Sequence, residues 1–188
     1  MFSRDEILRK LLGCFEVFLF MPRGVDRFGS SRKQALKSFF IPILLLPLVM
    51  LVMVGLSPGY SWNLLIAIHL IRTVATIALG LGAVYFLTAQ FGRSECFYKF
   101  LNVSNWYSIP TVILTFPIIT AFMFGYDMSL MESYAVFITI LGVVYMAFMV
   151  RYVFRLPWEI GGFIAIVCLA IDQNLFGVAL YVRDWVSI

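Results

Sequence analysis

Residues 160–182 read IGGFIAIVCLAIDQNLFGVALYV, a run of apolar side chains that is long enough to cross a bilayer as a helix. Asp172, Gln173 and Asn174 stand in succession inside this run. Ionisable and amide side chains are costly in hydrocarbon, and within a membrane they generally face a bundle interior or a water-filled cavity. The run therefore predicts a membrane-spanning helix whose polar segment needs a partner on another helix.

The composition of the whole chain points to the same class. The chain has 188 residues, of which 62% are hydrophobic and 13% are charged, and its mean hydropathy is +0.97. A soluble domain is about half apolar and about a quarter charged. We therefore expect an integral, multi-pass membrane protein without a sizeable soluble domain.

The apolar runs predict an all-α transmembrane bundle with five spans, preceded by a cytoplasmic N-terminal region over residues 1–37. The five-helix domain covers 38–188, with spans at about 39–56, 63–91, 106–124, 134–154 and 160–182. The second run would extend about 44 Å as a helix, against about 30 Å of hydrocarbon. Two alternatives follow: a tilted, overhanging helix, or a segment 63–71 that lies at the interface before a crossing that begins near Arg72.

The distribution of basic residues predicts the orientation. Lys and Arg number 8, 0, 2, 0, 2 and 1 before, between and after the five spans, when Arg151 near the end of the fourth span is counted with the segment that follows it. Because cytoplasmic segments carry the excess of Lys and Arg, the N-terminus is expected in the cytoplasm and the C-terminus outside. The expected location is the bacterial inner membrane, with a eukaryotic endomembrane as the alternative.

The N-terminal region contains an amphipathic pattern. The apolar residues recur at three- and four-residue steps, and charged residues fill the face between them: Ile7, Leu8, Leu11, Leu12, Phe15, Phe18 and Leu19 are apolar, and Arg4, Asp5, Glu6, Arg9, Lys10 and Glu16 are charged. Such a helix is suited to the membrane interface. A helix packed beneath the bundle is the alternative.

A basic segment follows that helix and consists of Arg23, Arg27, Arg32, Lys33 and Lys37. Such a cluster attracts anionic lipid at about 1 kcal/mol per cation near the surface, or it serves as the orientation signal alone. Nucleic-acid binding is not expected, because no recognition motif accompanies the charge. The expected partners are the lipid bilayer and another membrane protein, or the protein itself as an oligomer.

Two further ionisable residues, His69 and Arg72, lie deep in an apolar run. Counted from Trp62, Arg72 lies about 15 Å along its helix, and Asp172 lies at about the same depth when counted back from Arg183. This match predicts an Arg72–Asp172 ion pair, with His69 one turn nearer the exterior. If Arg72 lies at the boundary instead, Asp172 needs another partner.

The candidate site is therefore an intramembrane polar locus formed by His69, Arg72, Asp172, Gln173 and Asn174. If Asp172 is not paired with Arg72, Tyr145 and Thr115 are the next candidates for its partner. One interpretation is a neutralised pair that fixes the register of two helices. The other is a proton or ion pathway in which an Asp and a His change protonation.

The sequence offers no catalytic, metal or cofactor motif. One histidine excludes a His-rich metal site, and no GxSxG, P-loop or HExxH motif occurs. The cysteines, Cys14, Cys96 and Cys168, form no CxxC pair, so a disulfide or metal framework is not expected. We therefore expect no enzyme and no cofactor.

The layout of the chain resembles the Yip1-domain family and its small bacterial relatives. Phe39-Phe40-Ile41-Pro42 at the start of the first span and Gly125-Tyr126 in the third loop are similar to that family, whereas its Asp-Leu-x-Gly-Pro element is missing. The resemblance implies a membrane-organising or trafficking-type adaptor without a catalytic site. The expected function is thus a non-enzymatic adaptor, assembly factor or accessory subunit, and the alternative is a small proton- or ion-coupled transporter or channel that uses the polar locus.

Overall fold

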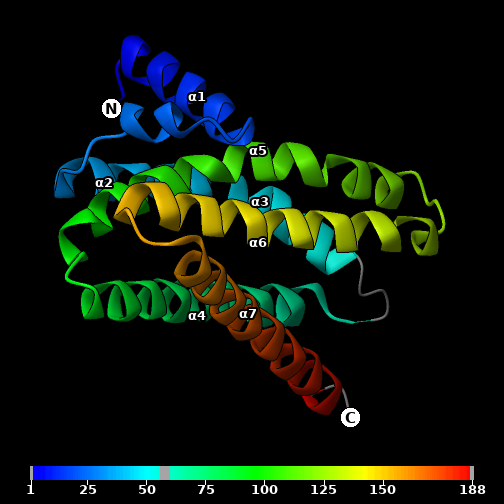
Figure 1. The fold of residues 1–188 in the computed structure, drawn as a ribbon. Coiled ribbons are helices and arrows are strands. Elements are labelled where there is room, and N and C mark those ends of the chain that lie inside the picture. The colour runs from blue at the N-terminus through cyan, green and yellow to red at the C-terminus, as the bar shows by residue number, and fades with distance from the viewer. Residues whose placement is uncertain (1, 56–59, 187–188) are drawn as a thin grey trace.

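The computed structural model describes residues 2–55 and 60–186, and all regular structure in these ranges is helical (Figure 1). The elements in chain order are α1 (Arg4–Phe18), η1 (Pro22–Arg27), α2 (Arg32–Ser38), α3 (Phe40–Gly55), α4 (Trp62–Gln90), η2 (Ser94–Cys96), α5 (Phe97–Met123), η3 (Met128–Met131), α6 (Glu132–Phe154) and α7 (Trp158–Val186). The expected end of the first span at residue 56 lies outside the described residues.

Four helical segments in the described chain are long and apolar enough to cross a membrane. They are Arg32–Leu51, Trp62–Gln90, Glu132–Phe154 and Trp158–Val186. The third expected span, 106–124, lies in α5 up to Met123 and is not one of these four. The structure is thus compatible with a multi-pass integral membrane protein and has the all-helical fold that the composition predicted.

Local sequence signals explain where the elements begin and end. The Ser3 hydroxyl accepts a hydrogen bond from the Glu6 amide at 3.2 Å, and Ser31 caps α2 in the same way, as preferred N-cap residues do. Gly92 and Gly125 follow α4 and α5 with φ of 67° and 68°, a backbone conformation that glycine adopts without strain. Residues 97–105, which were expected in a connection, form the first turns of α5 instead.

The long helices form two groups that share α7. Helices α3, α5 and α6 run side by side, α4 lies across from them, and α7 crosses obliquely and packs against both α4 and α6 (Figure 1). Helix α5 runs the length of the bundle, from the end where α4 finishes to the end where α6 begins. Helix α4 is continuous from Trp62, so His69 and Arg72 lie about two and three turns from its start.

The buried core lies at one end of the molecule. There α1 and η1 pack against the first half of α5 and the second half of α6, around Val17, Val25, Phe100, Trp106 and Phe148. By contrast, 11% of the most apolar window of α4 is buried. The helices are therefore well packed where the N-terminal region covers them and diverge elsewhere.

Helix α1 packs against α5 with a face that buries Lys10 and Cys14, and its buried residues include two charged ones. The side chains of Lys10 and Glu16 are 0% and 4% exposed, whereas Leu8, Leu12 and Phe15 on the apolar face point away from the bundle. Burying charge is tolerated when each charge is paired. The packed arrangement is thus possible because partners for these charges lie on α5 and η1.

Candidate functional site

The two deep charges that the sequence paired lie in contact across the seam between α4 and α7. Arg72 Nη1 lies 3.5 Å from Asp172 Oδ1, and the two side chains are 14% and 39% exposed. A distance of 3.5 Å is long for a charge-assisted hydrogen bond, so this is a loose ion pair. The Arg72 guanidinium also lies 5.2 Å from the centroid of the Phe176 ring, within the range of a cation–π contact.

Further polar contacts follow the same seam on either side of the pair. Toward one end, the Cys168 thiol lies 3.9 Å from the Gly80 carbonyl oxygen. Toward the other, the Tyr60 hydroxyl donates to Asp184 Oδ1 at 3.0 Å. Residue numbers fall along α4 as they rise along α7, so all three contacts belong to one antiparallel register. The ion pair is thus the middle one of three contacts that align α4 and α7.

His69 lies on the same helix but is not linked to the ion pair by a hydrogen bond. Its side chain is 4% exposed, and its Nδ1 has no hydrogen-bond partner in the described part of the chain. Arg72 Nε is likewise unpaired within those residues. The structure therefore places His69, Arg72 and Asp172 on one seam without joining them into a proton relay.

The amide residues beside Asp172 face other directions. Asn174 Nδ2 donates to the Ala170 carbonyl oxygen of its own helix at 2.7 Å. Gln173 lines, together with Asp172, Thr139 and Gly142, a crevice of about 310 Å³ between α6 and α7. Asp172 therefore meets Arg72 on one side and, on the other, a crevice that Gln173 and Thr139 also line.

The two alternative partners for Asp172 are engaged elsewhere. The Tyr145 hydroxyl donates to the Phe18 carbonyl oxygen at 2.6 Å, which ties the end of α1 to α6. The Thr115 hydroxyl donates to the Thr111 and Val112 carbonyl oxygens of its own helix. Arg72 is thus the partner that the structure gives to Asp172.

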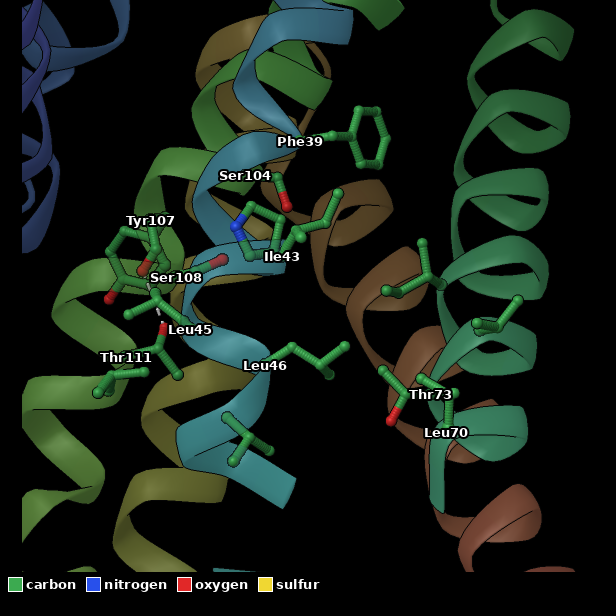
Figure 2. A pocket seen from close by; sticks show the side chains of 15 residues that line it. Phe39, Ile43, Leu45, Leu46, Leu70, Thr73, Ser104, Tyr107, Ser108 and Thr111 are labelled. Carbon is green, nitrogen blue, oxygen red and sulfur yellow. Dashed lines mark hydrogen bonds between the residues drawn. The ribbon is translucent and has the colours of Figure 1, made fainter. Parts of the chain in front are cut away.

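An apolar groove of about 490 Å³ lies between α3, α4 and α5 (Figure 2). Figure 2 shows Ile43 and Leu46 of α3 and Leu70 of α4 projecting into the space between these helices. A smaller cavity of about 250 Å³ shares Phe39, Pro42, Ile77, Ser104 and Ser108 with the groove and continues it toward Gly80 and Cys168. Together they form one lateral opening along the divergent part of the bundle.

The groove did not emerge from the sequence, although one signal could have indicated it. Ser104, Ser108 and Thr111 recur at four- and three-residue steps on α5 and line it, and residues at this spacing share a helix face. Such a small, polar stripe is typical of a helix–helix contact in lipid. The apolar lining from α3 and α4 gives no such signal, because it resembles any lipid-facing surface.

Most of the predicted basic cluster is paired with glutamates of α1. Arg27 donates two hydrogen bonds to the Glu16 carboxylate, one of them from Nη2 at 2.8 Å, and Arg23 lies 3.2 Å from the same group. Lys37 Nζ lies 2.6 Å from Glu6 Oε2. Arg32 and Lys33 remain exposed. Three members of the cluster therefore fasten the N-terminal elements together.

The buried charge of Lys10 is compensated in the same region. Its ammonium donates to Asn102 Oδ1 at 3.1 Å, lies 3.4 Å from Glu6 Oε1, and lies 5.4 Å from the centroid of the Trp106 ring. Burial lowers the pKa of Lys10, and the hydrogen bond to Glu6 opposes that shift. For Glu16, the hydrogen bond from Arg27 is the main cause of a lowered pKa.

Within the described residues, no group of three His, Cys, Asp or Glu side chains could hold a metal ion. The cysteines Cys14, Cys96 and Cys168 are free thiols. No family model matches the sequence, and neither a curated protein nor a solved structure matches it significantly. A function must therefore be inferred from the geometry of the molecule itself, and the similarity to the Yip1-domain family stays a prediction.

Proposed function

We propose that the protein is a non-enzymatic integral membrane adaptor, acting as an assembly factor or accessory subunit of a membrane complex. The observation that carries this proposal is the lateral groove between α3, α4 and α5, formed where the helices diverge. The groove is elongated along the helices and combines an apolar lining with serine and threonine hydroxyls. These are the features by which helices associate in lipid.

The proposed occupant of the groove is an apolar transmembrane segment of another membrane protein. Such a helix gains no hydrophobic free energy by leaving lipid, so its affinity must come from close packing and hydrogen bonds. Thr73 donates its hydroxyl to its own helix, while the small side chains of Ser104 and Ser108 allow a close approach. The alternative occupant is a second copy of this chain, because its own apolar helices have the same chemistry.

The proposed arrangement has five spans, with the N-terminus in the cytoplasm and the C-terminus outside. It is supported by α5, which joins α4 to α6 in the chain and runs the length of the bundle (Figure 1), and by the alternating Lys and Arg counts. Helix α1 would lie at the cytoplasmic membrane interface, with its apolar face toward lipid. The bacterial inner membrane is the proposed location, and the Yip1-like resemblance agrees with an adaptor role.

The polar locus fits a structural role within this proposal. Arg72 and Asp172 neutralise each other, and the neighbouring contacts of the seam share their register. A transport pathway needs a succession of titratable groups, and His69 is not joined to the pair. We therefore assign the locus to the alignment of α4 and α7.

Site-specific photo-crosslinking tests the adaptor proposal. A photoreactive amino acid at Leu46, inside the groove, should crosslink in intact membranes to one defined membrane protein, which also co-purifies in stoichiometric amount. The matched control is the same amino acid at Ile140, an exposed position of α6 outside the groove. Equal crosslinking from both positions, or crosslinks to lipid alone at Leu46, would contradict the proposal.

The crevice between α6 and α7 favours a second candidate, a small proton- or ion-coupled transporter or channel. Asp172, Gln173 and Thr139 present a carboxylate, an amide and a hydroxyl to a space of about 310 Å³, which lies at the lower end of small-ligand sites. In liposomes, a transporter would show pH-dependent flux that Asp172→Asn abolishes. A purified protein without flux and with a stoichiometric partner would favour the adaptor.

A further inference from the structure

The apolar face of α1 has no protein covering it in the described chain. Leu8, Leu12 and Phe15 are about half exposed, while Lys10 and Glu16 of the same helix are buried. An amphipathic helix normally turns its apolar face to the core of a protein or to lipid. The opposite face of α1 already packs against α5 and η1. The exposed apolar face is therefore suited to contact with hydrocarbon.

A groove of about 530 Å³ adjoins this face, between α1 and the joint of α2 with α3. Its lining is apolar apart from one lysine and consists of Phe2, Ile7, Leu36, Lys37, Phe39, Phe40 and Ile43. The groove lies where the first expected span begins, at residue 39. Its apolar wall continues along α3 through Ile43 and Leu44, which are both exposed. The groove therefore opens toward the expected hydrocarbon of the proposed cytoplasmic leaflet.

One basic side chain lines this groove, and two others precede lining residues by one helical turn. Lys37 lines it and is held by Glu6. Lys33 lies one turn earlier on the same face of α2, and Arg4 lies one turn before Ile7 on α1. Both Lys33 and Arg4 are exposed, and neither has an acidic partner among the described residues. An anionic group seated here would meet two unneutralised cations.

We propose that this groove binds an anionic phospholipid of the cytoplasmic leaflet. One acyl chain would lie against Leu36, Phe39 and Phe40, and the phosphate would lie between Arg4 and Lys33. An acyl chain gains little by moving from lipid to an apolar groove, so the selectivity for anionic lipid comes from the two cations. With each cation contributing as it does at a membrane surface, the preference over a zwitterionic lipid is on the order of 30-fold.

This inference rests on the proposed orientation for its choice of leaflet, but it does not depend on the adaptor role. The full-length protein is reconstituted in nanodiscs that contain equal amounts of phosphatidylglycerol and phosphatidylcholine. The lipids that remain bound after extraction with mild detergent are then quantified by mass spectrometry. We expect phosphatidylglycerol to be enriched about 30-fold on the wild-type protein.

Two variants and two matched controls test the site. The double substitution Arg4→Gln and Lys33→Gln should abolish the enrichment, and Leu36→Trp, which fills the groove, should reduce the total retained lipid. Arg93→Gln removes an exposed cation and Leu79→Trp enlarges an exposed leucine, both away from the groove, and neither should change retention. Because Lys33 and Arg4 contact no acidic partner in the described chain, their replacement should leave the fold intact.

Equal retention of both lipids by the wild-type protein would overturn the proposal. So would a loss of enrichment in Arg93→Gln as large as that in the double variant, since this would indicate a diffuse surface charge. Neither result bears on crosslinking at Leu46, because that residue lies in the α3–α4–α5 groove and does not line the proposed lipid site. Failure of the lipid site is thus distinguishable from failure of the adaptor proposal.

Discussion

At the scale of single residues, the Arg72–Asp172 contact is the ion pair that joins the two deepest charges of the apolar runs. Each charge by itself would be costly at membrane depth, and the contact offsets that cost without a short hydrogen bond. The carboxylate stays 39% exposed toward the α6–α7 crevice. The pair is therefore weaker than a fully enclosed one.

Neutralising one side of the pair should destabilise the protein. Breaking a buried pair costs about 3–5 kcal/mol, and the exposure of Asp172 reduces the expected loss for Asp172→Asn to about 1–3 kcal/mol. Combining it with Arg72→Gln should restore part of the loss, because no unpaired charge remains. The measurement is reversible unfolding in SDS. If each single variant is as stable as the wild-type protein, the pair does not stabilise the α4–α7 seam.

The carboxylate of Glu16 predicts a pH dependence confined to the N-terminal elements. The hydrogen bond from Arg27 lowers its pKa below the ordinary value of 4.5, so its contribution to stability is complete above pH 4.5 and is lost as the pH falls through the lowered pKa. Amide exchange slows intrinsically at lower pH, so the measurement is the protection factor, which should fall in α1 and η1 on acidification in that range. In Glu16→Gln the fall should be smaller. Protection factors that stay constant down to pH 3 in the wild-type protein would contradict the prediction.

At the scale of elements, the contact between α6 and α7 depends on one of two adjacent glycines. A Cβ atom on Gly161 would lie 2.7 Å from the Ala147 carbonyl oxygen, whereas a Cβ atom on Gly162 would meet nothing within 4 Å. Close approach of helix backbones is a common use of small residues in membranes. The crossing of α7 over α6 therefore requires glycine at residue 161.

Alanine substitutions at Gly161 and Gly162 should distinguish the effect of the α6–α7 contact from that of helix propensity. Gly161→Ala should destabilise the protein by about 1–3 kcal/mol, because the backbone of α6 must move away. Gly162→Ala, which makes no clash, serves as the control and should leave stability unchanged or slightly higher. Thermal and SDS unfolding of the two variants give the comparison. Equal effects would show that helix propensity, and not the α6–α7 contact, decides stability here.

At the scale of the whole molecule, the number of crossings sets the side on which the C-terminus lies. With five spans, the C-terminus lies opposite the N-terminus. If α5 did not cross, α6 would begin on the side where α4 ends, and both termini would lie on the same side. Four helical segments of the described structure are long and apolar enough to cross a membrane, and α5 is not among them. Whether α5 crosses therefore decides on which side the C-terminus lies.

Reporter fusions at the C-terminus should distinguish these topologies. An enzyme reporter that is active outside the cytoplasm should be active at the C-terminus, and a fluorescent reporter that folds only in the cytoplasm should be dark. The physical basis is the excess of Lys and Arg in the segments assigned to the cytoplasm. The same fusions placed in the 125–127 loop, between α5 and η3, serve as an internal control. The reverse pattern at the C-terminus would leave α5 outside the membrane.

The sequence by itself predicted most of the long helices and, as the first of its alternatives, the partnership of Arg72 with Asp172. Apolar runs must be long enough to cross the hydrocarbon, so their length and composition predict helices. Arg72 and Asp172 face each other because they are the acid and the base that lie deepest in these runs, at matching depth. The expected connection 92–105 was mostly wrong, because the polar side chains of the first turns of α5 find partners in the N-terminal region.

Only the tertiary structure decided which face of α1 meets the protein, where the core lies and where the grooves open. A helical pattern shows that two faces differ, but the inward face depends on Asn102 and Arg27, which chain folding brings beside Lys10 and Glu16. The divergence of the helices has a similar cause. Lipid tails are as apolar as the side chains they meet, so burial does not close a bundle in a membrane, and packing of specific residues must do so.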